Sequence, residues 1–366
     1  MSLFDLTALQ LGAAIRAGEV SARDAAKASL DAIAARQGEN NAFITVLAEQ
    51  AMAQANALDE DKEKLAVGPL AGVPAGVKDN ICTLDVKTSC ASKILGEFAP
   101  PYDATVMEKF RAAGGVMVGK LNMDEFAMGS TTETSFYGPA RNPWDLERVP
   151  GGSSGGAAAA VAAGECWYAL GSDTGGSIRQ PASYCGITGM KPTYGTVSRY
   201  GLIAYASSLD QIGPLARTAE DCAAVLDLLQ GRDKRDGTSL DFDAGHLLER
   251  LSTDLTGMKI GIPVDCFGDG LDPDVREKVL AVAEVLKGRG AQVEECKLPI
   301  MEYVVPTYYI IAAAEASSNL SRFDGVKYGW RAGDYEDLTD LYCKTRTEGF
   351  GREVQRRILL GTFVLS

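Results

Sequence analysis

The chain has 366 residues, of which 46% are hydrophobic and 23% are charged, a balance typical of soluble globular proteins. Its formal net charge of −13 argues against a protein that holds nucleic acid through its own basic surface. No apolar run is long enough to span a membrane, and the N-terminus lacks the pattern of a secretory signal. We therefore expect a cytoplasmic protein.

The first 66 residues predict helices. Ser21 fits the N-cap of a helix over "ARDAAKASLDAIAARQ", and "AEQAMAQANALDEDKEKL" forms a second amphipathic run. From residue 67 onward, short apolar strands alternate with helices. The expected strands are 71–80, 116–122, 166–173, 258–263 and 291–299, and the expected helices are 103–115, 156–164, 218–231 and 273–290. This alternation predicts an α/β fold with a central mixed, largely parallel sheet and helices on both faces.

We expect one domain over residues 1–366, made of the helical segment 1–66, a core over about 67–230 and a C-terminal part over 258–366. The charged, turn-rich stretch 231–257 fits either a domain boundary or a surface excursion, and we favour the excursion.

The eight cysteines include no C-x-x-C pair, which argues against a zinc site or a redox motif. Most of them lie among apolar or small residues, so we expect reduced, mostly buried thiols. The sequence thus predicts no metal site.

Two glycine-containing segments resemble known motifs without completing them. Residues 114–121, "GGVMVGKL", match a phosphate-binding loop except at Leu121, where a hydroxyl residue is required, and we interpret Lys120 as part of a strand. Residues 151–155, "GGSSG", match the G-x-S-x-G turn of a serine nucleophile, but a poor strand precedes them. That motif also needs a histidine base, and the sole histidine, His246, lies in a polar stretch.

A serine nucleophile without histidine requires another base, and a lysine can serve if burial lowers its pKa. A lysine usually titrates near 10.4, whereas a base at neutral pH works best with a pKa close to 7–8. Lys78 is the best candidate, because it ends the apolar run "AGVPAGV". Most lysines are solvated, so Lys78 alone is weak support.

A second Gly-Gly-Ser loop follows the predicted strand over 166–173. In "LGSDTGGSIRQPASYCG", the backbone N–H groups from Thr174 to Ser177 could converge on one oxygen and form an oxyanion hole. A plain tight turn is the alternative. Together with the first loop and Lys78, however, the combination favours a catalytic site.

Lys78, "GGSSGG" and "DTGGSIRQP" together resemble the amidase signature family, whose members hydrolyse amides with a Ser-cisSer-Lys triad. The resemblance implies that Ser177 is the nucleophile, Ser153 the bridging serine and Lys78 the base. It also assigns the oxyanion hole to the backbone of Thr174, Gly175, Gly176 and Ser177.

Three longer segments narrow the resemblance. "KLNMDEFAMGSTTETSFYGPARNPWD", "GMKPTYGTVSRYGLIAYASSLDQIGP" and "YYIIAAAEASSNLSRFDGVKYG" are similar to the glutamine-hydrolysing subunits of tRNA-dependent amidotransferases. The resemblance implies substrate-binding roles for five residues, namely Met128, Gly129, Ser130, Tyr308 and Arg357. On residues alone, Arg356 and Arg357 could both be solvated; the resemblance selects Arg357. Such subunits extend beyond "RRILLGTFVLS", so we expect part of the glutamine pocket outside this sequence.

The resemblance further implies hydrolysis of glutamine through an acyl-serine intermediate, with ammonia passed to a partner subunit. That partner, related to amidotransferase subunits B and C of a heterotrimer, would hold the tRNA and use ATP and Mg²⁺, whereas this chain needs no cofactor. Two alternatives remain, a stand-alone amidase that acts on other amides and a catalytically silent assembly subunit.

Overall fold

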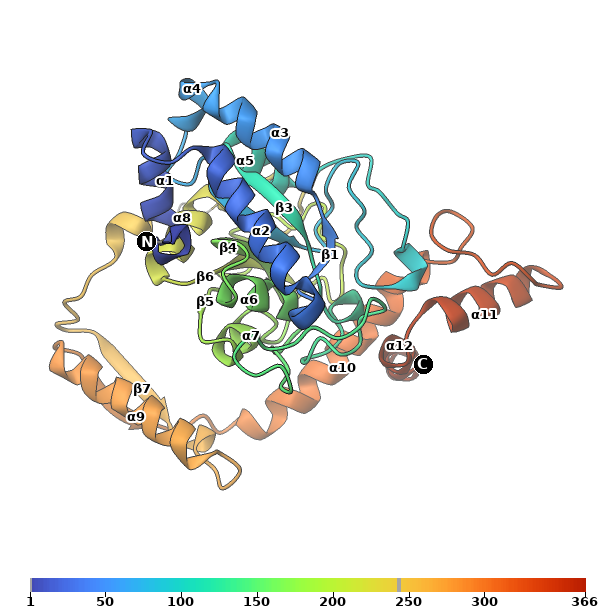
Figure 1. Ribbon diagram of the computed structural model, residues 1–366. Helices are drawn as coiled ribbons and strands as arrows, with labels where there is room; N and C mark the ends of the chain where they lie inside the picture. The colour runs from blue at the N-terminus through green and yellow to red at the C-terminus, as the bar shows by residue number, and fades with distance from the viewer. Residues whose placement is uncertain (1, 242–244) are drawn as a thin grey trace. The chain divides into compact units, whose positions relative to one another are not determined.

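The computed structural model describes residues 2–241 and 245–366 (Figure 1). Two compact units are present, and each is described by itself. The first comprises Met1–Leu248 and Ala312–Ser366, and the second comprises Glu249–Ile311. The division falls within the charged stretch 231–257. The interpretation of residues 1–366 as one domain stays a prediction.

A six-stranded sheet with the strand order β1-β3-β2-β4-β6-β5 forms the centre of the first unit. Its central strand β2 pairs in parallel with β3 and β4, while β1, β6 and β5 join through antiparallel pairings. The predicted mixed sheet is therefore confirmed, although β1, β5 and β6 were not expected from the sequence. The strands are β1 Phe43–Val46, β2 Pro74–Lys78, β3 Val116–Leu121, β4 Tyr168–Asp173, β5 Thr188–Gly189 and β6 Gln211–Ala216.

Helices cover both faces of this sheet, as expected. The chain crosses from β2 to β3 through α5 and returns from β3 to β4 through α6, and right-handed crossovers in opposite directions place these helices on opposite faces. In Figure 1, α2 and α6 lie in front of the sheet and α5 lies behind it. The helices are α1 Ala8–Ala17, α2 Ala22–Asn40, α3 Ala48–Asp59, α4 Lys62–Leu65, α5 Thr105–Ala112, α6 Gly155–Ala162, α7 Arg179–Tyr184, α8 Ala219–Leu229, α11 Leu338–Gly349 and α12 Arg352–Leu365. Helix α10, Met301–Asn319, begins in the second unit and ends in the first.

The N-terminal helices follow their capping residues. Ser21 Oγ accepts a hydrogen bond of 2.9 Å from the Asp24 N–H, which confirms the predicted N-cap of α2. The second amphipathic run, expected as one helix, divides into α3 and α4 instead. Asp61 accepts a hydrogen bond of 3.2 Å from the Lys64 N–H, so its side chain begins a new helix where one continuous helix was expected.

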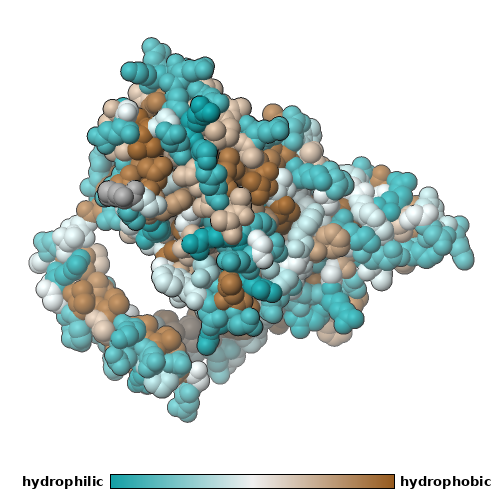
Figure 2. Space-filling view, in the orientation of Figure 1, coloured by the Kyte–Doolittle hydropathy of each residue, from teal (hydrophilic) through white to brown (hydrophobic). Residues whose placement is uncertain are grey.

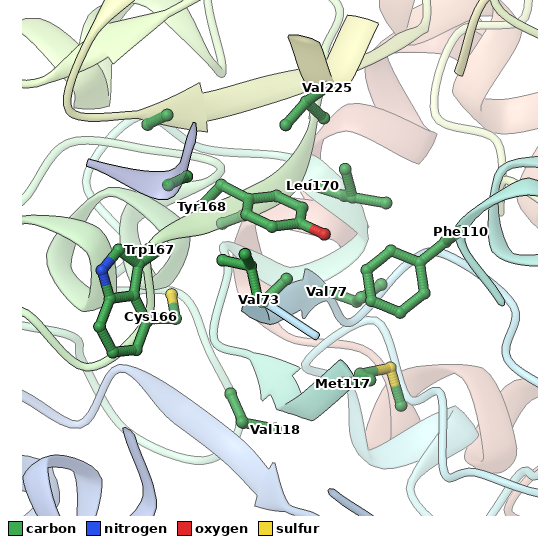
Figure 3. Close-up of a cluster of buried hydrophobic side chains, with 14 of the residues drawn as sticks. Val73, Val77, Phe110, Met117, Val118, Cys166, Trp167, Tyr168, Leu170 and Val225 are labelled. Atoms are coloured by element: carbon green, nitrogen blue, oxygen red, sulfur yellow. The ribbon is translucent and has the colours of Figure 1, made fainter. Parts of the chain in front are cut away.

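Buried apolar side chains of the central strands form the core of the first unit. Figure 3 shows Val77 of β2 beside Leu170 and Tyr168 of β4, with Phe110 of α5 across from them. The rings of Phe110 and Tyr168 lie 6.4 Å apart. Lys78 directly follows Val77, so the end of β2 carries a lysine into an environment with almost no water.

Five of the eight cysteines are buried free thiols, which agrees with the expectation for most of them. They are Cys82, Cys90, Cys166, Cys185 and Cys222. Cys266 and Cys343 are exposed instead.

The second unit is a small strand-helix-strand motif. Its strands β7, Lys259–Pro263, and β8, Gln292–Cys296, pair in parallel, and α9, Pro273–Gly288, connects them. The strand and helix predictions for this region are confirmed. A two-stranded sheet with one helix covers little apolar surface, and Figure 2 shows brown apolar patches along α9. The exposed apolar residues of this helix are Val275, Val279, Leu280, Val282 and Val285.

Candidate active site

Lys78 lies fully buried at the end of β2, surrounded by serines from two other segments. Its Nζ is 2.7 Å from Ser153 Oγ and 2.9 Å from Ser154 Oγ. Because Val77 pairs with Leu170, the next residues of β4 come within reach, and Nζ also contacts Ser172 Oγ at 3.0 Å. The structure therefore brings Lys78 and Ser153 together, as predicted.

Burial lowers the pKa of Lys78 from 10.5 to about 7, because the charged ammonium loses its water shell. Four acidic groups act in the opposite direction, namely Asp124, Asp173, Asp210 and Cys90. No carboxylate forms an ion pair with Lys78 among the described residues, and its Nζ is held by hydroxyl and carbonyl oxygens. A neutral lysine, able to accept a proton, is therefore available near pH 7.

The first glycine loop turns sharply before it enters α6. Its Gly152–Ser153 peptide bond is cis, and Gly151 adopts a φ of +83° that favours glycine. A Cβ on Gly156 would lie 2.4 Å from the Asn122 carbonyl oxygen, so only glycine allows α6 to pack this closely against the end of β3. The glycines thus hold Ser153 and Ser154 against Lys78.

Ser177 lies at the second glycine loop, between β4 and α7. Its carbonyl oxygen accepts a hydrogen bond of 3.0 Å from the Ser154 N–H, which joins the two loops. The residue is 7% exposed, and its hydroxyl makes no hydrogen bond to any of the residues that the structure describes. A hydroxyl without a fixed partner can rotate toward a bound substrate.

Asp173 organises the loop that contains Ser177. It receives two hydrogen bonds from Arg179, at 3.1 and 3.0 Å, and one of 3.0 Å from the Ile178 N–H. Burial acts to raise the pKa of Asp173, but these hydrogen bonds outweigh it and the pKa is lowered. Asp173 is therefore an ionised carboxylate whose hydrogen bonds fix the loop.

One of the four amides predicted to form the oxyanion hole has a hydrogen-bond partner in the structure, and the oxyanion hole itself stays a prediction. The Gly176 N–H donates to Asp173 Oδ1 at 2.8 Å, because the carboxylate at the end of β4 accepts backbone N–H groups from the turn, those of Gly176 and Ile178 among them. In this structure Gly176 therefore does not offer its amide to an oxyanion. The backbone N–H groups of Thr174, Gly175 and Ser177 remain the predicted donors.

Residues Met128, Gly129 and Ser130 lie beside the first glycine loop. Gln180 of α7 holds the two segments together, since its amide donates to the Ser130 carbonyl oxygen and accepts from the Gly152 N–H, each at 2.9 Å. Met128 is buried, and a Cβ on Gly129 would lie 2.3 Å from Asp124. The segment is therefore packed against the loop of Ser153.

Arg357 and Arg356 have different environments, as predicted from the resemblance. Arg357 of α12 is 5% exposed and donates to Glu353 Oε1 at 2.7 Å and to Tyr205 Oη at 2.6 Å. Arg356 is exposed and pairs with Glu353. Tyr205 in turn donates its N–H to Asp210, which also accepts from Thr174 of the second glycine loop.

Two other predictions have different outcomes. Tyr308 lies on α10 in the second unit, so its role in the site stays a prediction. His246 is exposed, in agreement with its interpretation as a surface histidine.

Sequence reasoning missed four residues that complete this arrangement. Ser154 and Ser172 contact Lys78, while Tyr205 and Asp210 connect Arg357 with the second glycine loop. The serine doublet in "GGSSG" was a usable signal for Ser154. No local pattern could have identified Ser172, Tyr205 or Asp210, since their roles depend on strand pairing and long-range contacts.

No cluster of three or more residues able to bind a metal occurs in the described parts of the chain. Within the same residues, no helix is sufficiently long and apolar to cross a membrane.

Comparison with known proteins agrees with this geometry. A family model described as Amidase matches residues 24–366. The A subunit of the glutamyl-tRNA(Gln) amidotransferase of Lachnospira eligens is 59% identical over the whole chain, which covers 76% of that protein.

Two solved structures are also similar. The A subunit of the glutamyl-tRNA(Gln) amidotransferase of Thermotoga maritima is 43% identical, with a TM-score of 0.77 and coverage of 100% of this chain and 72% of that one. The peptide amidase of Stenotrophomonas maltophilia is 30% identical, with a TM-score of 0.83 and coverage of 97% of this chain and 75% of that one. The chain therefore belongs to the amidase signature family, and within that family its sequence identity to the two amidotransferase A subunits is higher than its identity to the peptide amidase.

Proposed function

We propose that this chain is the glutaminase subunit of an aminoacyl-tRNA amidotransferase that converts Glu-tRNA(Gln) to Gln-tRNA(Gln). The names of the 59% and 43% identical relatives support the assignment to this complex. One observation supports the chemistry above all: buried Lys78 donates to Ser153 on a loop that is hydrogen-bonded to the loop of Ser177.

The first half-reaction forms an acyl-enzyme. Neutral Lys78 takes the proton of Ser153 Oγ, which takes the proton of Ser177 Oγ, and Ser177 Oγ bonds to the side-chain amide carbon of glutamine. The amides of Thr174, Gly175 and Ser177 stabilise the resulting oxyanion. When the C–N bond breaks, Ser153 returns a proton to the leaving nitrogen, so that ammonia departs and a glutamyl ester remains on Ser177.

The second half-reaction releases glutamate. Water loses a proton to the same Ser153–Lys78 relay and attacks the ester carbon, after which Ser177 recovers its proton. Because each proton taken by Lys78 is returned, the chain finishes the cycle unchanged and needs no cofactor for this chemistry.

Substrate choice depends on the charged end of glutamine. A buried guanidinium can bind a carboxylate through two parallel hydrogen bonds, a geometry that lysine cannot reproduce. Arg357 is buried and oriented by Glu353, and we assign it to the α-carboxylate of glutamine. Met128, Gly129 and Ser130 are assigned to the remaining surface of the pocket, and the role of Tyr308 rests on the resemblance alone.

The remaining steps belong to partner subunits. Ammonia passes to partners related to subunits B and C of a heterotrimer in the cytoplasm, and these partners would hold the ATP and Mg²⁺ needed to activate the glutamyl-tRNA. The net charge of −13 fits this division, because a strongly acidic chain is poorly suited to binding tRNA.

A stand-alone amidase is the second candidate. The 30% identity to a peptide amidase favours it, since the same triad chemistry could act on other amides. The much higher identity to amidotransferase subunits favours the first proposal.

A transamidation assay tests the proposal. The chain, assembled with candidate partner subunits, should release ammonia from glutamine far faster than from simple acyl amides and should amidate Glu-tRNA(Gln). Ser177→Ala should abolish glutamine-dependent amidation while leaving ammonium-dependent amidation intact. Equal rates on simple amides would favour the stand-alone amidase, and absence of acylation at Ser177 would favour a silent subunit.

A further inference from the structure

Asp210 is a buried carboxylate to which the triad chemistry assigns no role. It lies directly before β6 and is 3% exposed. Both of its oxygens are hydrogen-bonded: Thr174 Oγ1 donates at 2.6 Å, and the N–H groups of Tyr205 and Ala206 donate at 2.8 and 3.1 Å. So many donors on one buried carboxylate indicate that it fixes the segments that supply them.

Strand pairing explains why Asp210 meets the second glycine loop. Asp173, the last residue of β4, lies opposite Gln211, the first residue of β6. The residues just outside this pair are Thr174 and Asp210, which therefore face each other. Thr174 is also the first residue of the loop that leads to Ser177. Asp210 thus holds the loop at the point where it leaves the sheet.

Tyr205 connects Asp210 with Arg357. Its N–H donates to Asp210, its hydroxyl accepts from Arg357, and its ring lies 5.6 Å from the guanidinium. Tyr205 is 1% exposed, and its carbonyl oxygen accepts a hydrogen bond of 3.1 Å from Asn319 of α10. The side chain has little room to move, so the position of Asp210 affects both Arg357 and Thr174.

We propose that Asp210 is a positioning residue that sets the distance between the carboxylate-binding Arg357 and the oxyanion-binding loop of Ser177. Glutamine has a fixed separation between its α-carboxylate and its side-chain amide, so a site for it requires that these two groups be held in register. This inference rests on the proposed glutaminase function. The inference adds a physical connection between the residues that bind the two ends of the substrate.

Asp210 also acts on Lys78 through its charge. It is one of the groups that raise the pKa of Lys78, together with Asp124, Asp173 and Cys90. Burial raises the pKa of Asp210 itself to about 6, against hydrogen bonds from Thr174 and the backbone of residues 205 and 206 and the charge of Arg199. Removal of this negative charge should lower the pKa of Lys78, so that the lysine becomes neutral at lower pH.

Asp210→Asn tests the inference in the assembled complex, with glutamine as substrate. We expect kcat to fall by at least about tenfold and KM to rise, because misplacement of the reacting groups is costly. We also expect the acidic limb of the kcat/KM profile to move to lower pH. A merely structural role would not produce this shift in the remaining active enzyme.

Thr174→Val tests the contact while the Asp210 side chain is kept. It removes the hydroxyl that donates to Asp210 but keeps the shape of the side chain, so kcat should fall, and the acidic limb should move less than in Asp210→Asn. Thr174→Ser should restore most of the rate, since it keeps the hydroxyl. These two variants decide the question even if Asp210→Asn fails to fold.

Asp221→Asn is the matched control. Asp221 is also a buried carboxylate that accepts two backbone N–H groups, from Ala8 and Leu9, at a different place in the fold. Its replacement should leave kcat, KM and the pH profile unchanged. Wild-type kinetics in Thr174→Val, or the same losses in Asp221→Asn, would overturn the inference. Failure of the wild-type complex to use glutamine, with ammonium-dependent amidation intact, would instead overturn the proposed function.

Discussion

Two fully buried lysines lie on neighbouring strands of the same sheet, yet they have different surroundings. Lys78 ends β2 and contacts the hydroxyls of Ser153, Ser154 and Ser172. Lys120 of β3 contacts the carbonyl oxygen of Ile81 and two threonine hydroxyls.

Burial lowers the pKa of both lysines, and nearby acids raise it in both. A shifted pKa therefore does not by itself identify a catalytic lysine. The difference lies in the contacts. Lys78 contacts Ser153 and Ser154, and the Ser154 N–H is hydrogen-bonded to Ser177. Lys120 instead holds together the segment that contains Ile81, Thr83 and Thr88. The following predictions test this contrast.

Replacement of the two lysines should give the largest difference in catalytic rate. Lys78→Ala should lower the rate of ammonia release from glutamine by about 10²- to 10⁴-fold, since no other base contacts the Ser153 hydroxyl among the residues that the structure describes. Lys120→Met should leave the rate per folded molecule near that of the wild type. Steady-state kinetics on the assembled complex measure both. More than about a tenth of the wild-type rate in Lys78→Ala would exclude the proposed relay.

The two serines of the first glycine loop that contact Lys78 should give the next largest difference in rate. Ser153→Ala should reduce kcat strongly, though less than Lys78→Ala, because water can partly replace the missing hydroxyl. Ser154→Ala should have a smaller effect, since its hydroxyl donates to the Ser172 carbonyl oxygen at 3.0 Å and supports the loop. Equal kcat values in the two variants would contradict the assignment of Ser153 as the bridging residue.

A third buried cation, Arg357, should affect binding rather than chemistry. Arg357→Lys should raise KM for glutamine by at least about tenfold, because lysine cannot form the paired hydrogen bonds to a carboxylate. Arg356→Lys is the control and should leave KM unchanged, as Arg356 is exposed. Ammonium-dependent amidation should be normal in both. An unchanged KM in Arg357→Lys would remove Arg357 from the substrate site.

Lys120 should matter for stability instead. Lys120→Met leaves the Ile81 carbonyl oxygen and the hydroxyls of Thr83 and Thr88 without their shared donor. A buried group that loses its partner costs roughly 1–3 kcal/mol, so the free energy of unfolding should fall by about that amount. Denaturant titration measures it. A stability equal to that of the wild type would show that the contacts of Lys120 are dispensable.

The smallest expected effect concerns the pH dependence of kcat/KM. Lys78 acts only when neutral and has a pKa of about 7, so kcat/KM should rise as the pH increases through this value. Glu125 also has a pKa raised by burial to about 7, yet its hydrogen bonds go to Ser92 and Gly351. Glu125→Gln should therefore leave the acidic limb in place. If the acidic limb disappeared in Glu125→Gln, the limb would report the titration of Glu125, and our assignment of it to Lys78 would be wrong.

The sequence by itself determined much of the fold and supplied the prediction of the triad residues. Alternating apolar strands and helices predicted the mixed sheet, because periodicity records which side chains must be buried. The glycine loops marked Ser153 and Ser177, since close backbone packing and positive φ values restrict a position to glycine. The apolar run before Lys78 made it the candidate base, and the resemblance to amidases then selected Arg357.

Only the tertiary structure decided the environments of these residues. Whether Lys78 is neutral depends on complete burial, and the difference between Lys78 and Lys120 depends on which oxygens each reaches. The Gly176 amide was predicted to face an oxyanion, but Asp173 binds it. Hydrogen bonds between residues far apart in the chain leave no local pattern, and for that reason the link from Asp210 to Arg357 became visible only in the folded chain.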